Sequence, residues 1–270
     1  MSNFINQLSK LEKPIIGMVH LAGLPGSVHF KESFETTAQR ALNETEILMN
    51  AGFDGVLFQN TGDAPASEEG DEATVAFMTS VGISLRDICS KLLGVNVLMN
   101  GSKAALAIAS AIAADFIRIK INAGVVATST GLVQADPHNV LSFRNRIGAH
   151  DIDIIGDLYD RTAAPVGEFP IEILADLAIR HADVDALIVS GYGEQDQINR
   201  LKNLREKMPE AYLVSGGGVN INNLPTFMNI SDAIIVGSSI KTGGGFLDPL
   251  DPQKAEEFVN KAQQLREENI

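Results

Sequence analysis

Polar side chains that can do chemistry stand at or near the ends of several short apolar runs of the chain. His20, Lys120 and Asp157 occupy such positions. An imidazole or a carboxylate can accept a proton, and a partly desolvated lysine can attack a carbonyl or hold an anion. We predict these three residues as catalytic groups. Further residues in similar positions are predicted to bind substrate: Asn60, Asp63, Asn100, Asn122, Arg161 and Ser190.

The residue types leave more than one role open for each catalytic candidate. Asp157 could act as a general base, pair with Lys120 or hold a metal ion. Lys120 could be a nucleophile or a point charge for an anionic substrate. His20 could contact the ligand or be a core residue. The other histidines show no metal-ligand spacing, so we predict neither a metal site nor a cofactor.

Two glycine-rich turns near the end of the chain indicate an anion site. One covers residues 215–220 (SGGGVN) and the other residues 237–241 (GSSIK). Glycine lets backbone amides approach an anion closely, and the N-terminus of a helix adds a favourable dipole. The alternative is that the glycines only form tight loops. We predict phosphate binding by Gly217, Gly218, Gly237, Ser238 and Ser239.

These candidates must be positioned by short β-branched runs that alternate with longer helical patterns. Parallel strands need crossover helices, and eight strand–helix units are typical of a closed (β/α)8 (TIM) barrel. We therefore predict an α/β fold with one such domain over residues 1–270. The predicted strands are Ile15–His20, Gly55–Gln59, Val95–Met99, Phe116–Asn122, Ile152–Leu158, Ala186–Ser190, Tyr212–Ser215 and Ala233–Val236. The predicted helices cover 33–50, 72–93, 103–113, 170–181 and 194–207, and three more begin at Asp136-Pro137, after Asn222 and at Asp251-Pro252.

An open, doubly wound sheet is the structural alternative. Such a sheet usually carries a glycine-rich nucleotide turn after its first strand, and residues 20–26 (HLAGLPG) lack that pattern. In a barrel, by contrast, the C-terminal ends of all strands converge on one site, which would gather the polar residues named above.

The fourth predicted strand places charge inside the barrel. Three isoleucines alternate there with Arg118, Lys120 and Asn122, and side chains alternate faces along a strand. The isoleucines should face the helices, so we expect the polar three to face the interior, with Arg118 in a buried ion pair. The following residues, 123–135, are predicted to form an irregular loop that closes over the ligand.

Charge and hydropathy limit the possible partners. The 270 residues carry a formal net charge of −13 and show no basic patch, which argues against nucleic acid as a partner. The longest apolar stretch, 104–114, is too short to span a bilayer, and residues 1–13 do not resemble a signal peptide. We expect a cytoplasmic protein without a membrane span. Peripheral membrane contact and a homo-oligomer stay open.

Several motifs together resemble the BtpA family, which includes SgcQ-type proteins. They are PIIGMVHL (14–21), LPGS (24–27), GFDG (52–55), GDAP (62–65), GVNVL (94–98), DFIR (115–118), IVSG (188–191), VGSSIK (236–241) and DPLDP (248–252). The resemblance covers nearly the whole chain and implies a TIM barrel. Founding members of the family look like photosystem I biogenesis factors, whereas others occur in sugar-utilisation gene sets and are suspected enzymes.

The chain departs from the family pattern at three turns. Family members usually carry Thr-Asp-Gln-Gly, Arg-Asn-Asp and Lys-His, where this chain has Thr128–Gly131 (TSTG), Met99–Gly101 (MNG) and Arg161-Thr162. Ionisable residues are thus replaced by neutral ones, while Asp157, Asp63 and His20 are retained.

Two functions follow as hypotheses. The first is an enzyme that acts on a small phosphorylated metabolite, a sugar phosphate or a nucleoside-like compound, by lyase, isomerase or glycosyl-bond chemistry. The second is a non-catalytic biogenesis, assembly or regulatory factor that keeps the anion pocket. The replaced ionisable residues favour the second hypothesis more than they would in a standard family member.

Overall fold

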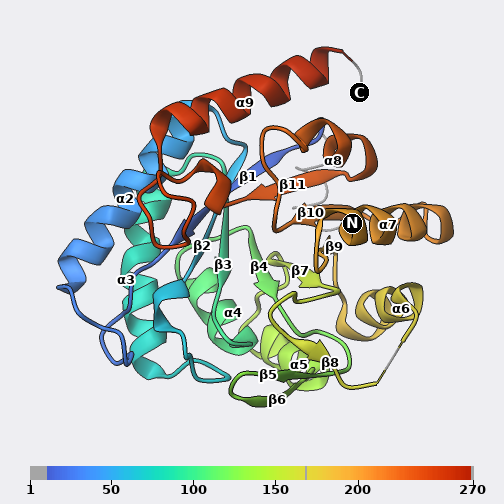
Figure 1. Cartoon of the computed structure of the whole chain (residues 1–270). Coiled ribbons are helices and arrows are strands. Elements are labelled where there is room, and N and C mark those ends of the chain that lie inside the picture. The colour runs from blue at the N-terminus through green and yellow to red at the C-terminus, as the bar shows by residue number, and fades with distance from the viewer. Residues whose placement is uncertain (1–10, 168, 269–270) are drawn as a thin grey trace.

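A computed structural model describes residues 11–167 and 169–268. Eight parallel strands close into a barrel with helices around it, so the predicted TIM barrel is confirmed and the open sheet is excluded (Figure 1). The barrel strands, in the order in which they neighbour one another, are β1 (Ile15–His20), β11 (Ala233–Val236), β10 (Leu213–Gly216), β9 (Ala186–Val189), β7 (Asp153–Asp157), β4 (Phe116–Ile119), β3 (Leu92–Asn96) and β2 (Gly55–Gln59), which again neighbours β1.

Helices follow the strands and cover the outside of the barrel. The predicted caps are confirmed, because Asp136 and Asp251 each accept hydrogen bonds from backbone amides of the first turn, next to a proline at its start. The helices are α2 (Phe34–Ala51), α3 (Glu72–Ile88), α4 (Ser102–Ala111), α5 (Pro137–Arg146), α6 (Ile171–Ala182), α7 (Glu194–Lys207), α8 (Leu224–Ile230) and α9 (Pro252–Glu267), with short 3₁₀ turns η1 (Thr61–Asp63) and η2 (Ser238–Ile240).

Alternation along the strands divides the core into two apolar layers. Met18, Leu57 and Phe116 belong to a cluster inside the barrel, whereas Val19, Phe58 and Ile117 belong to the larger cluster between strands and helices. Gly94 of β3 leaves the space that the Phe116 ring fills, since a Cβ there would lie 2.2 Å from the ring. The interior is therefore packed, and the functional space lies above it.

The third strand differs from its prediction. β3 covers Leu92–Asn96 rather than Val95–Met99, and α3 ends at Ile88 rather than continuing to Leu93. The apolar pair Leu92-Leu93 fits a buried strand as well as a buried helix, and the structure pairs it with Gly55-Val56 of β2. Asn96, and not Asn100, therefore occupies the end of this strand.

The segment after the fourth strand also differs from its prediction. Residues 123–135 are not irregular, because β5 (Val125–Thr128) and β6 (Gly131–Gln134) form an antiparallel hairpin, which β8 (Ala164–Pro165) extends. β4 itself ends at Ile119. The hairpin lies on the side of the barrel mouth near α6, outside the closed sheet (Figure 1).

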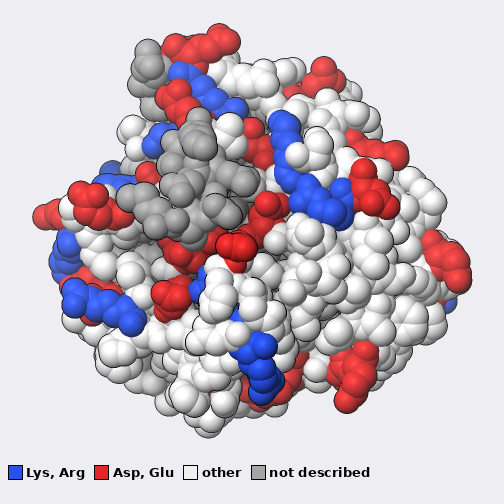
Figure 2. All heavy atoms as spheres, turned by 180° about the vertical axis from the view of Figure 1, so that it is seen from behind, with Lys and Arg blue, Asp and Glu red and all other residues white. Residues whose placement is uncertain are grey.

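The face turned away from the viewer of Figure 1 carries acidic and basic side chains that are intermingled (Figure 2). Among the described residues drawn there, basic side chains form no continuous patch. No helix in residues 11–167 and 169–268 combines the length and apolarity that crossing a membrane requires.

Candidate functional site

A cavity of about 910 Å³ opens at the C-terminal ends of the strands. Its size is that of a typical small-molecule site. Predicted site residues from six different strand ends meet in its wall, which is the convergence expected of a barrel. These are His20, Lys120, Asp157, Arg161, Ser190, Gly217, Gly218, Gly237 and Ser238.

Arg118 and Asp157 form an ion pair at the bottom of the cavity. The Nε and Nη2 atoms of Arg118 donate to the two carboxylate oxygens of Asp157 at 2.8 and 2.7 Å. Burial raises the pKa of the Asp157 carboxyl, and Arg118 opposes that effect. The expected inward position and buried pairing of Arg118 are thus observed. Because both Asp157 oxygens are used by this fork, the carboxylate is held in place rather than free to accept a proton.

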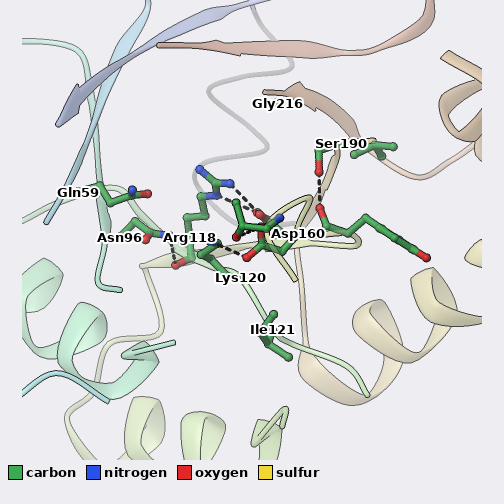
Figure 3. A network of polar contacts seen from close by, with 12 residues as sticks. Gln59, Asn96, Arg118, Lys120, Ile121, Asp160, Ser190 and Gly216 are labelled. Carbon is green, nitrogen blue, oxygen red and sulfur yellow. Dashed lines mark hydrogen bonds and ion pairs between the residues drawn. The ribbon is translucent and has the colours of Figure 1, made fainter. Parts of the chain in front are cut away.

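Lys120 pairs with Asp160, not with Asp157. Its Nζ atom lies 2.6 Å from Oδ2 of Asp160, and both side chains are almost completely buried. Burial alone would raise the pKa of the Asp160 carboxyl, but Lys120 and the hydrogen bonds from Thr162 outweigh it and lower the pKa. Asp160 is therefore a carboxylate at neutral pH. Figure 3 shows Arg118, Lys120 and Asp160 side by side, with Asn96 of the neighbouring strand next to Arg118 and Gln59 beyond it.

His20 is a neutral imidazole in the cavity wall. Burial lowers its pKa from 6.5 to about 3, and the nearby cations Lys241, Arg118 and Arg40 contribute to that lowering. Its Nδ1 atom is buried and has no partner among the described residues. The ring packs edge-on against Phe246 at 5.6 Å between centroids. At neutral pH the ring can donate or accept a hydrogen bond but carries no charge.

The glycine turn after β10 and Arg161 form one corner of the cavity. Gly217 and Gly218 have φ angles of +79° and +80°, a backbone region that residues other than glycine rarely adopt. The guanidinium of Arg161 lies 3.8 Å from the place that a Cβ of Gly217 would take. Within the described residues, no acceptor takes the backbone amides of these glycines and no carboxylate pairs with Arg161. Unpaired amides beside a free guanidinium fit an anion.

The strand-end serines have mixed positions. Ser190 lines the cavity, and its hydroxyl donates to the Tyr159 carbonyl. Ser238 also lines the cavity, next to Gly237, where a Cβ would lie 3.0 Å from His20. Ser239 does not line the cavity, and its hydroxyl donates to the Val219 carbonyl at 2.8 Å, which joins the two glycine turns.

The four predicted amide and carboxylate residues of the early loops do not line the cavity. The Asn60 side chain donates to Asp63 and accepts from the Leu98 amide, and Asp63 accepts from the Leu24 amide. These hydrogen bonds connect neighbouring loops. The Asn100 side chain donates to the Ile121 carbonyl and accepts from the Ile121 amide. The side chain of Asn122 donates to the Asp157 carbonyl and lies against Gly156, so the expected inward direction is wrong.

Sequence reasoning did not select several residues that line the cavity. Asp160 lies in the loop after β7, three residues beyond a predicted site residue, and the acidic–basic pair Asp160-Arg161 was the available signal. Arg40 projects from α2, where nothing in the sequence distinguishes it from a surface arginine. The remaining examples are Gln59, Thr61, Thr128, Ser129, Thr162 and Phe246.

Metal ligands are not gathered at this site or elsewhere in the described ranges 11–167 and 169–268. No three His, Cys, Asp or Glu side chains there are grouped as a metal ion would require. The inner part of the site offers two ion pairs, a neutral imidazole and a candidate anion corner, and His29, Lys31, Glu32 and Arg40 also line the cavity.

Comparison with known proteins supports the fold and shows the family. A barrel of N-(5′-phosphoribosyl)anthranilate isomerase from Pyrococcus furiosus superimposes with a TM-score of 0.58 at 12% identity, covering 93% of this chain and 99% of that chain. An uncharacterised protein of Thermococcus kodakarensis is 35% identical over 96% of this chain and 98% of its own length. The photosystem I biogenesis protein BtpA of Synechocystis is 30% identical over 94% of this chain and 89% of its own length. The BtpA family model matches residues 11–264, and the chain belongs to the BtpA family.

Proposed function

We propose that the protein is an enzyme that binds a small phosphorylated metabolite at the C-terminal mouth of the barrel. The observation that carries this proposal is the corner formed by Arg161, Gly217 and Gly218. The Arg161 guanidinium has no carboxylate partner in the described chain and lies 3.8 and 4.0 Å from the Cβ positions of two glycines whose backbone amides have no acceptor there. Loops after the last two strands are the recurrent phosphate position of TIM barrels. The cytoplasm is the compartment we propose for it.

The reacting part of the substrate would lie beside Lys120 and Asp160. Asp160 is ionised and can accept a proton from carbon or oxygen, while Lys120 can stabilise the negative charge that then develops. Neutral His20 can donate a hydrogen bond from the opposite wall. We propose Asp160 instead of Asp157 as the general base. In the described chain Oδ1 of Asp160 accepts from Thr162 but its Oδ2 contacts only Lys120, whereas the Arg118 fork holds both oxygens of Asp157. These groups suit lyase, isomerase or glycosyl-bond chemistry.

Binding of ribose 5-phosphate, measured by titration calorimetry at low salt, tests the anion corner. Gly217→Asp should weaken binding by about 100-fold, because a carboxylate then faces the phosphate and the Arg161 guanidinium is neutralised. Gly148→Asp is the matched control, since Gly148 also has a positive φ, of 69°, with no atom within 4 Å of the place that a Cβ would take, and lies in the loop before β7 at the other end of the barrel. Equal loss in both variants, or no binding to the unsubstituted protein, refutes the phosphate site.

A second candidate function is a non-catalytic biogenesis or regulatory factor. It is favoured by the two closed ion pairs, Arg118–Asp157 and Lys120–Asp160, which engage both aspartates that line the described part of the site. A panel of sugar phosphates and nucleotides separates the two candidates. Turnover that disappears in Asp160→Asn identifies an enzyme, whereas tight binding without turnover across the panel identifies a factor.

A further inference from the structure

A second cavity of about 830 Å³ lies beside the first and is lined by residues of β5, β8 and α6. Its walls come from segments that are far apart in the chain and that meet only because the hairpin folds over the mouth. Polar and apolar groups both line it, and the polar ones contribute somewhat more of its surface. The apolar residues of its wall include Val125, Val126, Leu158, Pro165, Phe169 and Leu174.

The two cavities share one charged wall. Lys120, Asp157 and Asp160 line both of them, so the Lys120–Asp160 ion pair lies at their junction. The candidate anion corner begins at the next residue, Arg161, on the first-cavity side. A ligand anchored at Arg161 therefore needs to extend only past this ion pair to reach the second cavity.

The second cavity also leaves apolar side chains open to solvent. Phe169 and Val166 are 54% and 51% exposed at its edge. Exposed apolar side chains around a concave space mark a place where an apolar group binds. Phe169 adds an aromatic ring to this wall, and such a ring suits stacking with a planar group.

We infer that the second cavity binds a planar ring that belongs to the phosphorylated substrate. The substrate is then a phosphate ester whose other end is an aromatic or heterocyclic group, with its phosphate at Arg161 and Gly217 and its middle beside Lys120 and Asp160. This inference rests on the proposed function, because the phosphate supplies the anchor. It goes further in naming the second half of the substrate.

The test compares ligands that share the phosphate end and differ in the ring. Adenosine 5′-monophosphate and uridine 5′-monophosphate carry a base, and ribose 5-phosphate does not. We expect at least one nucleotide to bind about 10-fold more tightly than ribose 5-phosphate, which equals about 1.4 kcal/mol. A gain below about threefold for both nucleotides overturns the inference.

Variants locate the ring. Val126→Trp fills the second cavity, so it should remove the advantage of the nucleotides and leave ribose 5-phosphate binding unchanged. Ala127→Trp is the matched control, because Ala127 is the next residue of β5, is exposed and does not line the cavity. Phe169→Ala, at an exposed position, tests the same wall without adding bulk and should weaken nucleotide binding by about threefold or more.

The outcomes separate the inference from the proposal beneath it. If Val126→Trp folds and still binds nucleotides more tightly than ribose 5-phosphate by the full margin, the ring lies elsewhere and the inference is overturned. If Val126→Trp fails to fold, the same result in Phe169→Ala overturns it. Ribose 5-phosphate binding that is lost in Gly217→Asp would still support the proposed function in that case. If no phosphate ester responds to Gly217→Asp, the proposed function itself has failed.

Discussion

Replacing His20 by glutamine should make the protein less sensitive to acid. The folded protein holds His20 neutral until about pH 3, whereas the unfolded chain protonates it below pH 6.5. Between these values the unfolded state binds one more proton, so the free energy of unfolding falls as the pH falls. This contribution is absent above pH 6.5, and His20→Gln removes it at every pH.

The size of the effect follows from the two pKa values. Each pH unit within the window costs up to about 1.4 kcal/mol, so lowering the pH from about 7.5 to about 5.0 should cost about 2 kcal/mol through His20. Urea unfolding of wild type and His20→Gln at both pH values measures it. The stability lost between the two pH values should be about 2 kcal/mol smaller in the variant, since this comparison cancels all groups that the two proteins share.

His138→Gln controls for the loss of any one imidazole, because His138 lies in the first turn of α5 and lines neither cavity. Its acid sensitivity should match that of wild type. In an independent measurement, the imidazole resonance of His20 should not titrate between about pH 8 and about pH 5 by NMR. A titration with a midpoint near 6.5, or equal acid sensitivity in wild type and His20→Gln, would show that burial does not keep this imidazole neutral.

Three further predictions concern packing, a buried charge and the reaction. Gly94→Ala should destabilise the fold by about 2 kcal/mol in urea unfolding, because its Cβ would lie 2.2 Å from the Phe116 ring; Phe116→Leu in the same chain should recover part of the loss. Lys241→Met should cost about 2 kcal/mol by the same assay, because buried Glu44 loses one of its two cationic partners and keeps only Arg40, and the double variant with Glu44→Gln should cost less. Asp160→Asn should lower kcat on any substrate found by about 100-fold, with a smaller change in KM.

The fold was predictable because its signals are repetitive. Recognising eight apolar runs separated by helical patterns is enough to predict the barrel, because errors of a few residues at the ends of the runs do not change the topology. The places of the glycine turns were predictable for a similar reason, because numbering the apolar runs along the chain puts these turns after the seventh and eighth strands. Asp157, Lys120 and His20 come to the mouth because strand ends of a barrel must meet there.

Residue-level roles were less predictable because they depend on register and on pairing. A shift of β3 by three residues places Asn96 at the strand end and moves Asn100 into a turn, where it bonds Ile121 instead of a ligand. Which aspartate pairs with Lys120 depends on the path of the loop after β7. No pattern in the sequence specifies that Asp160 turns back to Lys120 while Arg118 takes Asp157.

The charges at the mouth explain how a chain of net charge −13 can bind an anion. Asp157 and Asp160 neutralise Arg118 and Lys120, so these four residues contribute no net charge. On one side Arg161 is left over without a carboxylate partner in the described chain. On the other side two cations, Arg40 and Lys241, share the single carboxylate of Glu44.

The mouth is therefore locally positive although the whole surface repels anions at long range. Such a field attracts a phosphate only within about one Debye length, about 8 Å at physiological salt. Affinity for a phosphorylated ligand should consequently fall as salt is added, and the fall should be shallower in Arg161→Gln than in Arg118→Gln, because only Arg161 keeps an uncompensated charge. Equal salt dependence in the two variants would mean that the anion is held by the Arg118–Asp157 fork and not by the glycine corner.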